Sequence, residues 1–307
     1  MRAASIDIGT NTIRLAIVEK DKNCNFKFLL RKGKIARLGE DIAKTHLLKP
    51  QAIDRAIAVL KQYKAIIDSY KVEKVFCLAT SATREAENSE LFINKAKELG
   101  FDIEIIDGKK EAFLTHLCII YFLREVLANK SWVAVDIGGG STEFIFSRGF
   151  ELIDSFSVPL GVVKLLEMFI RHDPPQESEL NEACDYFIDN LKRFVKSDFN
   201  IDCFVANAGT PTTLAAIKLG LVEYDYYATE GLELSKDFIE KIIDEMLKYN
   251  SDKLLEVYPI LQKGREDVIV LGAYLLKRLL EFFGMESVVV TNGSLREGIF
   301  IERLCDG

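Results

Sequence analysis

The sequence predicts an α/β protein of two duplicated domains that face each other across a cleft. A strand–turn–strand pattern over residues 4–18 recurs over residues 133–146, and the first strand of each copy ends in Asp-Ile-Gly, beginning at Asp7 and at Asp136. An internal repeat of this kind indicates a duplicated structural unit. The chain has 307 residues, which is enough for two ordinary domains that each bury a sizeable core.

The composition is that of a soluble globular protein, because 49% of the residues are hydrophobic and 28% are charged. The most apolar run, residues 268–276, is about half the length that a membrane span needs. The N-terminus begins directly with a patterned strand and lacks the apolar core of a signal peptide, so we expect a cytoplasmic protein. The net charge of −7 argues against broad nucleic-acid binding. The six cysteines include no Cys-x-x-Cys pair, which predicts reduced core thiols and no disulfide or zinc site.

The first domain is expected to span residues 1–126. Short apolar runs between turn residues predict its strands, and apolar residues at helical spacing predict its helices. In chain order we expect strands at 2–8, 12–19 and 25–30, a helix at 51–70, strands at 74–79 and 101–106, and a helix ending near 126.

The second domain, residues 127–294, repeats this order. We expect strands at 132–136, 142–147 and 150–156, helices ending near 170 and spanning 177–195, a strand at 201–206, a helix from about 209, a loop at 223–231, helices at 235–249 and 264–283, and a strand at 287–291. A final helix begins at Leu295.

The repeated turn in the second domain is a candidate phosphate-binding loop. It consists of Gly138, Gly139, Gly140, Ser141 and Thr142. Glycines permit positive φ and a close approach of backbone N–H groups to an anion, and the two hydroxyls add donors. Asp136 and Glu143 flank the loop, where their carboxylates can hold a divalent cation. Taken alone, the same residues also fit a glycine-rich β-hairpin turn.

The N-terminal copy of the turn differs at one informative position. Arg14 stands where the second copy has Glu143. One half of the protein therefore offers a cation to phosphate, and the other offers a carboxylate to a metal.

Three further segments carry candidate functional residues. Arg84 follows a strand end, as a phosphate clamp would, but it is also compatible with a solvated residue beside a helix capped by Ser81 or Thr83. Glu111 lies in a first helical turn, where a Glu usually complements the helix dipole, but its place after a strand end lets it project into the cleft.

The third segment is Gly209–Leu214, which begins a helix. Gly209 and the hydroxyls of Thr210, Thr212 and Thr213 gather at this helix N-terminus and form a second candidate anion cradle. A strongly capped helix start with Pro211 near its first position explains much of the same pattern.

The segment from Lys22 to Gly39 contains basic residues and no acidic one. Its basic residues are Lys22, Lys27, Arg31, Lys32, Lys34 and Arg37. They fit either the solvated face of an edge hairpin or a strip that guides an anionic substrate.

With these motifs in place, the chain resembles the exopolyphosphatase / guanosine pentaphosphate phosphohydrolase (Ppx/GppA) family of the actin-like, sugar-kinase and Hsp70 superfamily. The resemblance spans nearly the whole chain and is carried by residues 5–14, 79–86, 108–112, 135–143, 208–215, 264–270 and 295–298. It implies two ribonuclease H-like (actin-like ATPase) domains, with a final helix at 295–307 that packs back on the first domain. It also implies a phosphohydrolase that releases terminal phosphate from inorganic polyphosphate, guanosine pentaphosphate (pppGpp) or both.

The resemblance assigns roles to the candidate residues. Glu111 is implied as the general base, and Asp136 and Glu143 as ligands of Mg²⁺ or Mn²⁺, with Asp7 as a further candidate ligand. The residues implied to hold the phosphate chain are Asn11, Arg14, Arg84, Gly138, Gly139, Gly140, Ser141, Thr142, Gly209 and Thr210. The expected partners are these small polyanions and a second copy of the chain in a homodimer, with neither nucleic acid nor membrane.

Two positions depart from the family pattern. Ala208 stands where the family usually has the first of two glycines, and Asn292 replaces an aspartate. These departures, with the short length, keep open a non-catalytic sensor that binds polyphosphate or an alarmone. A third alternative is an ATP-dependent kinase or ATPase of the same superfamily.

Overall fold

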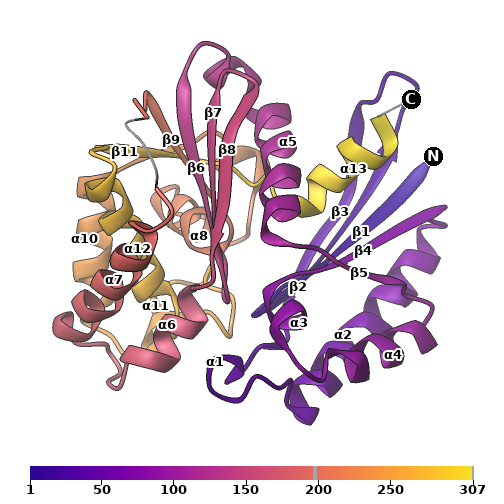
Figure 1. The fold of residues 1–307 in the computed structure, drawn as a ribbon, viewed down its shortest axis with the longest axis horizontal. Coiled ribbons are helices and arrows are strands. Elements are labelled where there is room, and N and C mark those ends of the chain that lie inside the picture. Colours follow the sequence, from indigo (N-terminus) through magenta and orange to yellow (C-terminus); the bar gives the residue numbers. More distant parts are fainter. Residues whose placement is uncertain (196–198, 306–307) are drawn as a thin grey trace. The chain divides into compact units, whose positions relative to one another are not determined.

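The computed structural model describes residues 1–195 and 199–305, and the chain packs as two compact units (Figure 1). Unit 1 contains Met1–Cys118 and the chain from Gly293 onward, and unit 2 contains Ile119–Asn292. The division falls inside one helix, whereas the sequence analysis placed it at the end of that helix, after residue 126. Residues 306 and 307 of the expected final helix lie outside the described residues.

Unit 1 is a mixed sheet with helices on both faces. In chain order its elements are β1 (Arg2–Ile8), β2 (Thr12–Lys20), β3 (Phe26–Ile35), α1 (Ile42–Thr45), α2 (Pro50–Ser69), β4 (Lys74–Ala79), α3 (Ser81–Glu85), α4 (Ser89–Glu98), β5 (Ile103–Ile105), the first part of α5 (Gly108–Leu127), and α13 (Leu295–Cys305). The strand order is β3-β2-β1-β4-β5, with β1 parallel to β4 and antiparallel to β2.

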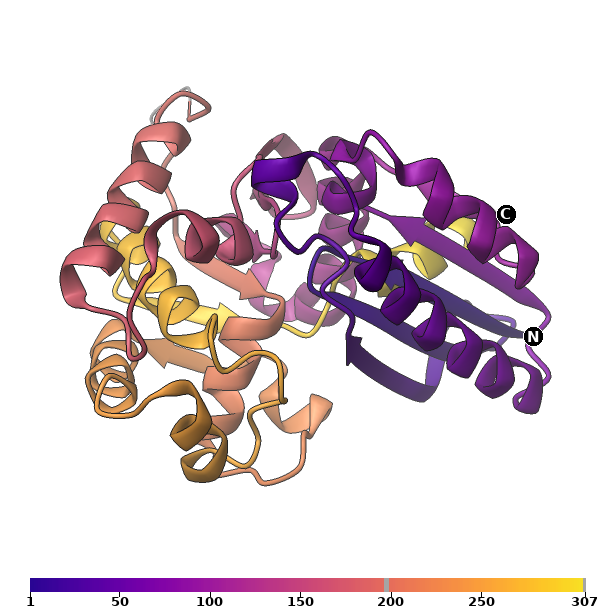
Figure 2. The ribbon, with the colours of Figure 1, turned by 90° about the horizontal axis from the view of Figure 1, so that it is seen from below.

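The alternation of side chains along β1 explains why both faces of this sheet are covered. Ile6 and Ile8 belong to a core shared with α2 and α4, whereas Ala3 lies in a second core with residues of α13. Figures 1 and 2 show α2 and α4 along one face of the sheet and α13 on the other.

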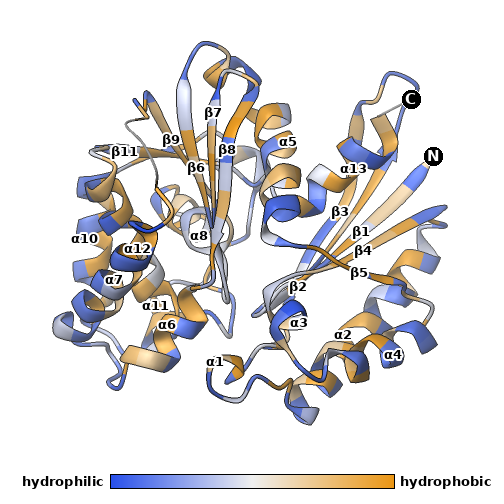
Figure 3. Cartoon of the chain, viewed as in Figure 1, coloured by the Kyte–Doolittle hydropathy of each residue, from blue (hydrophilic) through white to orange (hydrophobic). Residues whose placement is uncertain are grey.

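Unit 2 contains the rest of α5 and a second mixed sheet. Its further elements are β6 (Ser131–Ile137), β7 (Thr142–Arg148), β8 (Glu151–Val158), α6 (Val162–Phe169), α7 (Glu177–Leu191), β9 (Cys203–Asn207), α8 (Gly209–Lys218), α9 (Tyr226–Thr229), β10 (Glu233–Ser235), α10 (Lys236–Met246), α11 (Ser251–Val257), α12 (Ile269–Phe282) and β11 (Ser287–Val290). The strand order is β10-β11-β9-β6-β7-β8. Hydrophobic residues concentrate in the strands and in α12, and they build one large core (Figure 3).

The two sheets confirm the predicted duplication. When each sheet is followed from the edge strand of its first hairpin, the order β3-β2-β1-β4-β5 of unit 1 matches the order β8-β7-β6-β9-β11 of unit 2, and unit 2 adds β10 at the far edge. The repeated turn is also alike, because Gly9 N donates to Thr12 O (3.1 Å) and Gly138 N donates to Ser141 O (3.0 Å). Two duplicated α/β domains are therefore present, and their arrangement across a cleft stays a prediction.

The prediction that all six cysteines are reduced thiols is wrong. Cys24 and Cys305 form a disulfide with a Cα–Cα distance of 5.7 Å, which joins the β2–β3 connection to the end of α13. The pairing was invisible in the sequence because 281 positions separate the two residues. The other four cysteines are buried thiols, as expected, and burial raises the pKa of Cys184 to about 12.

The structure also contains elements that the sequence analysis did not expect. They are α1, α3, α4, α9, α11 and β10, of which α1 and α9 are single helical turns. Apart from α4, which has ten residues, these elements are too short to show a clear periodicity in the sequence.

The basic segment lies mainly on β3, which is an edge strand of the unit 1 sheet. Lys27 and Lys32 are exposed, as edge lysines would be. Arg31 instead turns inward, where its guanidinium stacks on Phe28 and lies 3.5 Å from Glu297. The segment as a whole is therefore neither a purely solvated face nor a continuous strip for anions.

Among the described residues, no helix combines the length and the apolar character that crossing a membrane requires.

Candidate functional site

Unit 2 places the two predicted metal ligands side by side. In the antiparallel pairing of β6 and β7, Asp136 is the direct partner of Glu143, so both side chains project from the same face of the sheet. Both are largely buried, with relative exposures of 8% and 1%. Two adjacent, hard carboxylate oxygens are suited to Mg²⁺.

The donor set around this pair fits a cation that also binds phosphate. No group of three or more His, Cys, Asp and Glu side chains able to hold a metal occurs among residues 1–195 and 199–305. Mg²⁺ usually takes only one or two carboxylates and fills its octahedron with water and substrate phosphate oxygens. A carboxylate pair beside the predicted phosphate loop therefore fits Mg²⁺, which does not require a cage made only of protein ligands.

Two neighbouring side chains that the sequence analysis did not select contact this carboxylate pair. Asn207 Nδ2 donates to Asp136 Oδ2 at 2.6 Å, and Ser157 Oγ donates to Glu143 Oε1 at 2.7 Å. The first contact depends on the pairing of β6 with the distant strand β9, and the second on the register of the β7–β8 hairpin, so no motif in the sequence revealed either.

The glycine-rich loop is held by the start of α6. Val162 N donates to Gly138 O (3.0 Å) and Val163 N to Gly139 O (2.9 Å). In a trans peptide the N–H points opposite to the C=O, so the N–H groups of Gly139 and Gly140 are directed away from α6. Consecutive N–H groups that point the same way form an anion-binding concavity. The loop geometry thus supports the predicted phosphate-binding role.

The expected reason for the first glycine needs correction. Gly138 does not have a positive φ, and a Cβ there would lie 2.7 Å from Ser141 O. Glycine is required at this position because the turn closes tightly on itself. Thr142 does not offer its proton to an anion either, since its hydroxyl donates to Leu160 O at 2.8 Å.

Replacing Gly161 with alanine should displace this loop. Gly161 has an extended backbone (φ −135°, ψ 175°) that alanine adopts easily, but its Cβ would lie 2.4 Å from Gly138 O and 2.5 Å from Gly139 C. These are backbone atoms, so the loop itself must move. We expect Gly161→Ala to lower the free energy of unfolding by about 1–3 kcal/mol, as overpacking does. Thermal unfolding without ligand measures the loss of stability, and unfolding with tripolyphosphate measures whether the displaced loop still binds phosphate. A variant with wild-type stability and wild-type stabilisation by tripolyphosphate would contradict the expectation.

The second anion cradle, at the start of α8, is only partly as predicted. Thr212 and Thr213 donate their hydroxyls to the carbonyls of Ala208 (2.6 Å) and Gly209 (2.7 Å), so these protons are directed to the backbone. Thr210 is buried. Ala208 has a φ of 72°, so it keeps a backbone conformation that favours glycine, at a cost of roughly 1–3 kcal/mol.

A guanidinium group that the sequence analysis did not select lies against this cradle. A Cβ on Gly209 would meet Arg265 Nη1, and it would lie 2.7 Å from Arg265 Cζ. The glycine therefore makes room for Arg265 at the helix N-terminus, where a guanidinium adds positive charge for an anion. Arg265 belongs to the Gly264–Val270 motif, which was noticed in the sequence without a role for the arginine.

Unit 1 presents the matching pair from the first copy of the turn. Asp7 and Arg14 are direct partners in the β1–β2 pairing, which is the register of Asp136 and Glu143. Arg14 pairs in turn with Gly33 on β3, whose missing side chain leaves the Arg14 stem uncovered. Asn11 lies in the turn, and its carbonyl accepts hydrogen bonds from the N–H groups of residues 36 and 37. The two copies therefore place an acid beside a base in unit 1 and an acid beside an acid in unit 2, at equivalent paired positions.

Glu111 and Arg84 are brought together in unit 1. Glu111 lies in the first turn of α5 with 7% exposure, and Arg84 Nη1 is 3.7 Å from Glu111 Oε2. Arg84 Nη1 also donates to Ile106 O at 2.8 Å. The alternative of a solvated Arg84 does not hold, and neither Ser81 nor Thr83 caps α3, whose N-cap Thr80 makes no side-chain cap. A buried carboxylate oriented by a guanidinium can act as a general base.

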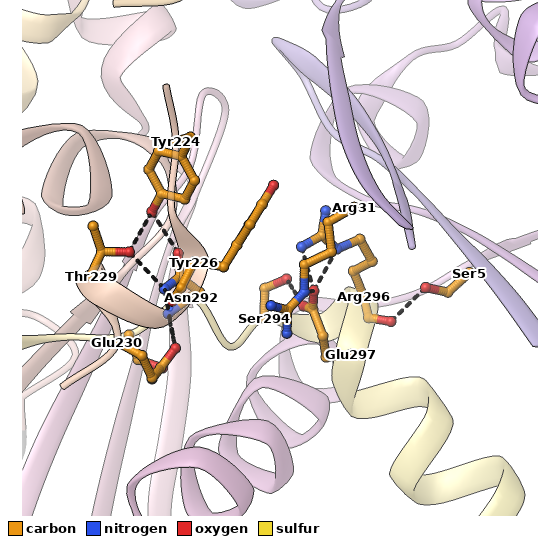
Figure 4. Close-up of polar contacts among 11 residues, drawn as sticks. Ser5, Arg31, Tyr224, Tyr226, Thr229, Glu230, Asn292, Ser294, Arg296 and Glu297 are labelled. Atoms are coloured by element: carbon orange, nitrogen blue, oxygen red, sulfur yellow. Dashed lines mark hydrogen bonds and ion pairs between the residues drawn. The ribbon is translucent and has the colours of Figure 1, made fainter. Parts of the chain in front are cut away.

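Both the oxygen and the nitrogen of the Asn292 amide make hydrogen bonds in a polar cluster of unit 2 (Figure 4). Its Oδ1 accepts from Tyr224 Oη (2.6 Å), and its Nδ2 donates to Tyr226 O (2.9 Å) and to Glu230 Oε2 (3.2 Å). An aspartate could not donate to these acceptors and would be repelled by Glu230. Asparagine therefore fits the surroundings of position 292 better than aspartate would.

Comparison with known proteins shows which sequences resemble this chain. The profile described as the Ppx/GppA phosphatase family matches residues 16–306. The chain is 35% identical to a bifunctional 3-dehydroquinate synthase/phosphatase of Fusobacterium nucleatum, over 97% of this chain and 46% of that protein. It is 29% identical to exopolyphosphatase 2 of Mycobacterium tuberculosis, over 97% of each. It is 24% identical to a guanosine-5'-triphosphate,3'-diphosphate pyrophosphatase of Aliivibrio fischeri, over 96% of this chain and 58% of that protein.

Solved structures show the same fold. The Aquifex aeolicus member of the Ppx/GppA family superposes with a TM-score of 0.82 at 33% identity, covering 99% of this chain and 98% of that chain. An exopolyphosphatase from Cytophaga hutchinsonii superposes with a TM-score of 0.91 at 25% identity, with 99% and 98% covered.

Proposed function

Since this chain belongs to the Ppx/GppA phosphatase family and has its two actin-like domains, we propose that it hydrolyses terminal phosphoanhydride bonds with the help of Mg²⁺. The substrates are inorganic polyphosphate, guanosine pentaphosphate, or both. The names of the mycobacterial and Aliivibrio relatives support these two substrate classes.

The observation that carries the proposal is the position of Glu111. Its carboxylate is buried in the first turn of α5 and lies beside the Arg84 guanidinium. Hydrolysis of a phosphoanhydride requires a base that accepts a proton from the attacking water, and it does not require a protein nucleophile.

The remaining residues bind and orient the phosphate chain. The N–H groups of Gly139 and Gly140 are proposed to bind phosphate oxygens, and the guanidinium of Arg14 is a further proposed phosphate ligand. The carboxylates of Asp136 and Glu143 would hold Mg²⁺, which when bound neutralises charge on the phosphate oxygens. Each role is a matter of positioning and electrostatics, which is where catalysis of phosphoryl transfer mainly lies.

The proposal is tested by measuring phosphate release from long-chain polyphosphate, guanosine pentaphosphate and ATP in parallel, each with Mg²⁺ and with EDTA. We expect release from at least one of the first two, a loss of release in EDTA, and slow or no release from ATP. Binding of polyphosphate with no release at any Mg²⁺ concentration would favour a sensor. Turnover of ATP alone would favour a kinase or ATPase.

A further inference from the structure

A single row of polar side chains crosses four neighbouring strands of unit 2. Asn207 on β9 is the direct partner of Asp136 on β6, Asp136 is the partner of Glu143 on β7, and Glu143 is the partner of Ser157 on β8. Directly paired residues project from the same face of a sheet. The two carboxylates therefore lie in the middle of the row, and a hydrogen-bond donor lies on each side.

Both outer residues make the contact that this order permits. Asn207 donates to one oxygen of Asp136 at 2.6 Å, and Ser157 donates to one oxygen of Glu143 at 2.7 Å. Asn207 is fully buried, and its Oδ1 has no hydrogen-bond partner among the described residues. Among the described residues, the side chain of Asn207 therefore makes a hydrogen bond only to Asp136. This indicates that the main polar role of Asn207 is to hold the Asp136 carboxylate.

We infer that Asn207 and Ser157 are positioning residues of the cation site, and this inference rests on the proposed Mg²⁺ dependence. Two carboxylates in direct cross-strand contact repel each other and turn apart unless something fixes them. A donor on the outer side of each fixes the plane of its carboxyl group, so that the remaining carboxylate oxygens would be oriented to hold a divalent cation. Hydrogen-bonding partners that orient metal ligands typically contribute about 10–100-fold in metal affinity.

The corresponding row in unit 1 supports this interpretation. There, Leu78 on β4 pairs with Asp7, Asp7 with Arg14, and Arg14 with Gly33 on β3. The central pair already has opposite charges, and neither Leu78 nor Gly33 has a side chain that can donate a hydrogen bond. The outer donors thus occur in the copy whose central residues are two carboxylates, and they are missing from the copy that has an acid and a base.

The experiment compares two substitutions of nearly equal shape at Ser157. Ser157→Thr keeps the hydroxyl and Ser157→Val removes it, and the edge strand β8 tolerates either β-branched residue. Mn²⁺ is titrated into each full-length variant and the free ion is measured by EPR. We expect Ser157→Val to weaken Mn²⁺ binding by about tenfold and Ser157→Thr to bind as the wild type does. Ser155→Val, on the same face of β8 but in the next row, is the matched control and should leave binding unchanged.

The other side of the row is tested with Asn207→Leu, which keeps the branching of the side chain and removes the donor. We expect a loss of Mn²⁺ affinity of at least tenfold, and thermal unfolding without metal separates this loss from a folding defect. If the wild type binds Mn²⁺ and both Ser157→Val and Asn207→Leu bind it equally well, the inference is overturned. If the wild type binds no Mn²⁺ but still releases phosphate, the metal part of the proposed function fails, and the inference fails with it.

Discussion

Replacing Glu111 with glutamine should reduce kcat for phosphate release by roughly 10²–10⁴-fold, the usual contribution of a general base. Glutamine has the shape of glutamate and can still contact Arg84, but it cannot accept the proton of the attacking water. KM should stay close to its wild-type value, because Glu111 is not proposed to bind the phosphate chain. Steady-state phosphate release and binding of tripolyphosphate by calorimetry measure the two parts separately.

The matched control for this variant is Glu90→Gln. Glu90 is also a glutamate in a first helical turn, that of α4, but it is exposed. The control removes the same charge from a helix N-terminus and should leave kcat unchanged. A Glu111→Gln enzyme with wild-type kcat would mean that another residue, or no residue, takes the proton.

The features that the sequence predicted well are those encoded locally or by repetition. The turn from Gly9 to Thr12 and the turn from Gly138 to Ser141 have the same hydrogen bond, and the strands that enter them, β1 and β6, are buried almost throughout, as their apolar runs predict. Because the two copies share a register, the pairing of Asp136 with Glu143 also follows from the repeat once the turn is recognised. The duplicated α/β fold could therefore be predicted without any long-range information.

The features that the sequence did not predict depend on contacts between distant segments. Asn207 reaches Asp136 only because β9 pairs in parallel with β6, and Arg265 lies against Gly209, the first residue of α8, although the two residues are far apart in the sequence. The inward turn of Arg31 follows from the return of α13 to unit 1, since Glu297 is its partner. Neither a strand pattern nor a motif contains the register that creates such contacts.

Glu297 provides the second large effect. It lies in α13 between two buried guanidinium groups: Arg31 Nε is 3.5 Å and Arg296 Nε is 2.8 Å from Glu297 Oε1 (Figure 4). Ser294 Oγ donates to its other oxygen at 2.9 Å, and Ser5 Oγ donates to Arg296 O at 2.6 Å. The cluster joins α13 to β1 and β3 inside unit 1.

Removing this carboxylate should destabilise the protein strongly. Glu297→Ala leaves two buried positive charges without the carboxylate between them, and the loss of one partner from a buried ion pair costs about 3–5 kcal/mol. Denaturation in urea measures the change in the free energy of unfolding. Glu104→Ala is the control, because its pair with Arg303 is half exposed and should contribute no more than about 1 kcal/mol.

The same carboxylate should make stability depend on acid pH. Burial by itself would raise the pKa of Glu297, but the charges of Arg296 and Arg31 outweigh it and hold the pKa below its ordinary value. Its contribution is therefore present above the unfolded-state pKa of about 4.3 and is lost as the pH falls through the lower folded-state pKa. Glu297→Gln, which keeps the shape and cannot titrate, should differ most from the wild type near neutral pH and least in strong acid. A difference between the two proteins that stays constant from pH 7 to pH 3 would show that the loss comes from packing and not from the charge of Glu297.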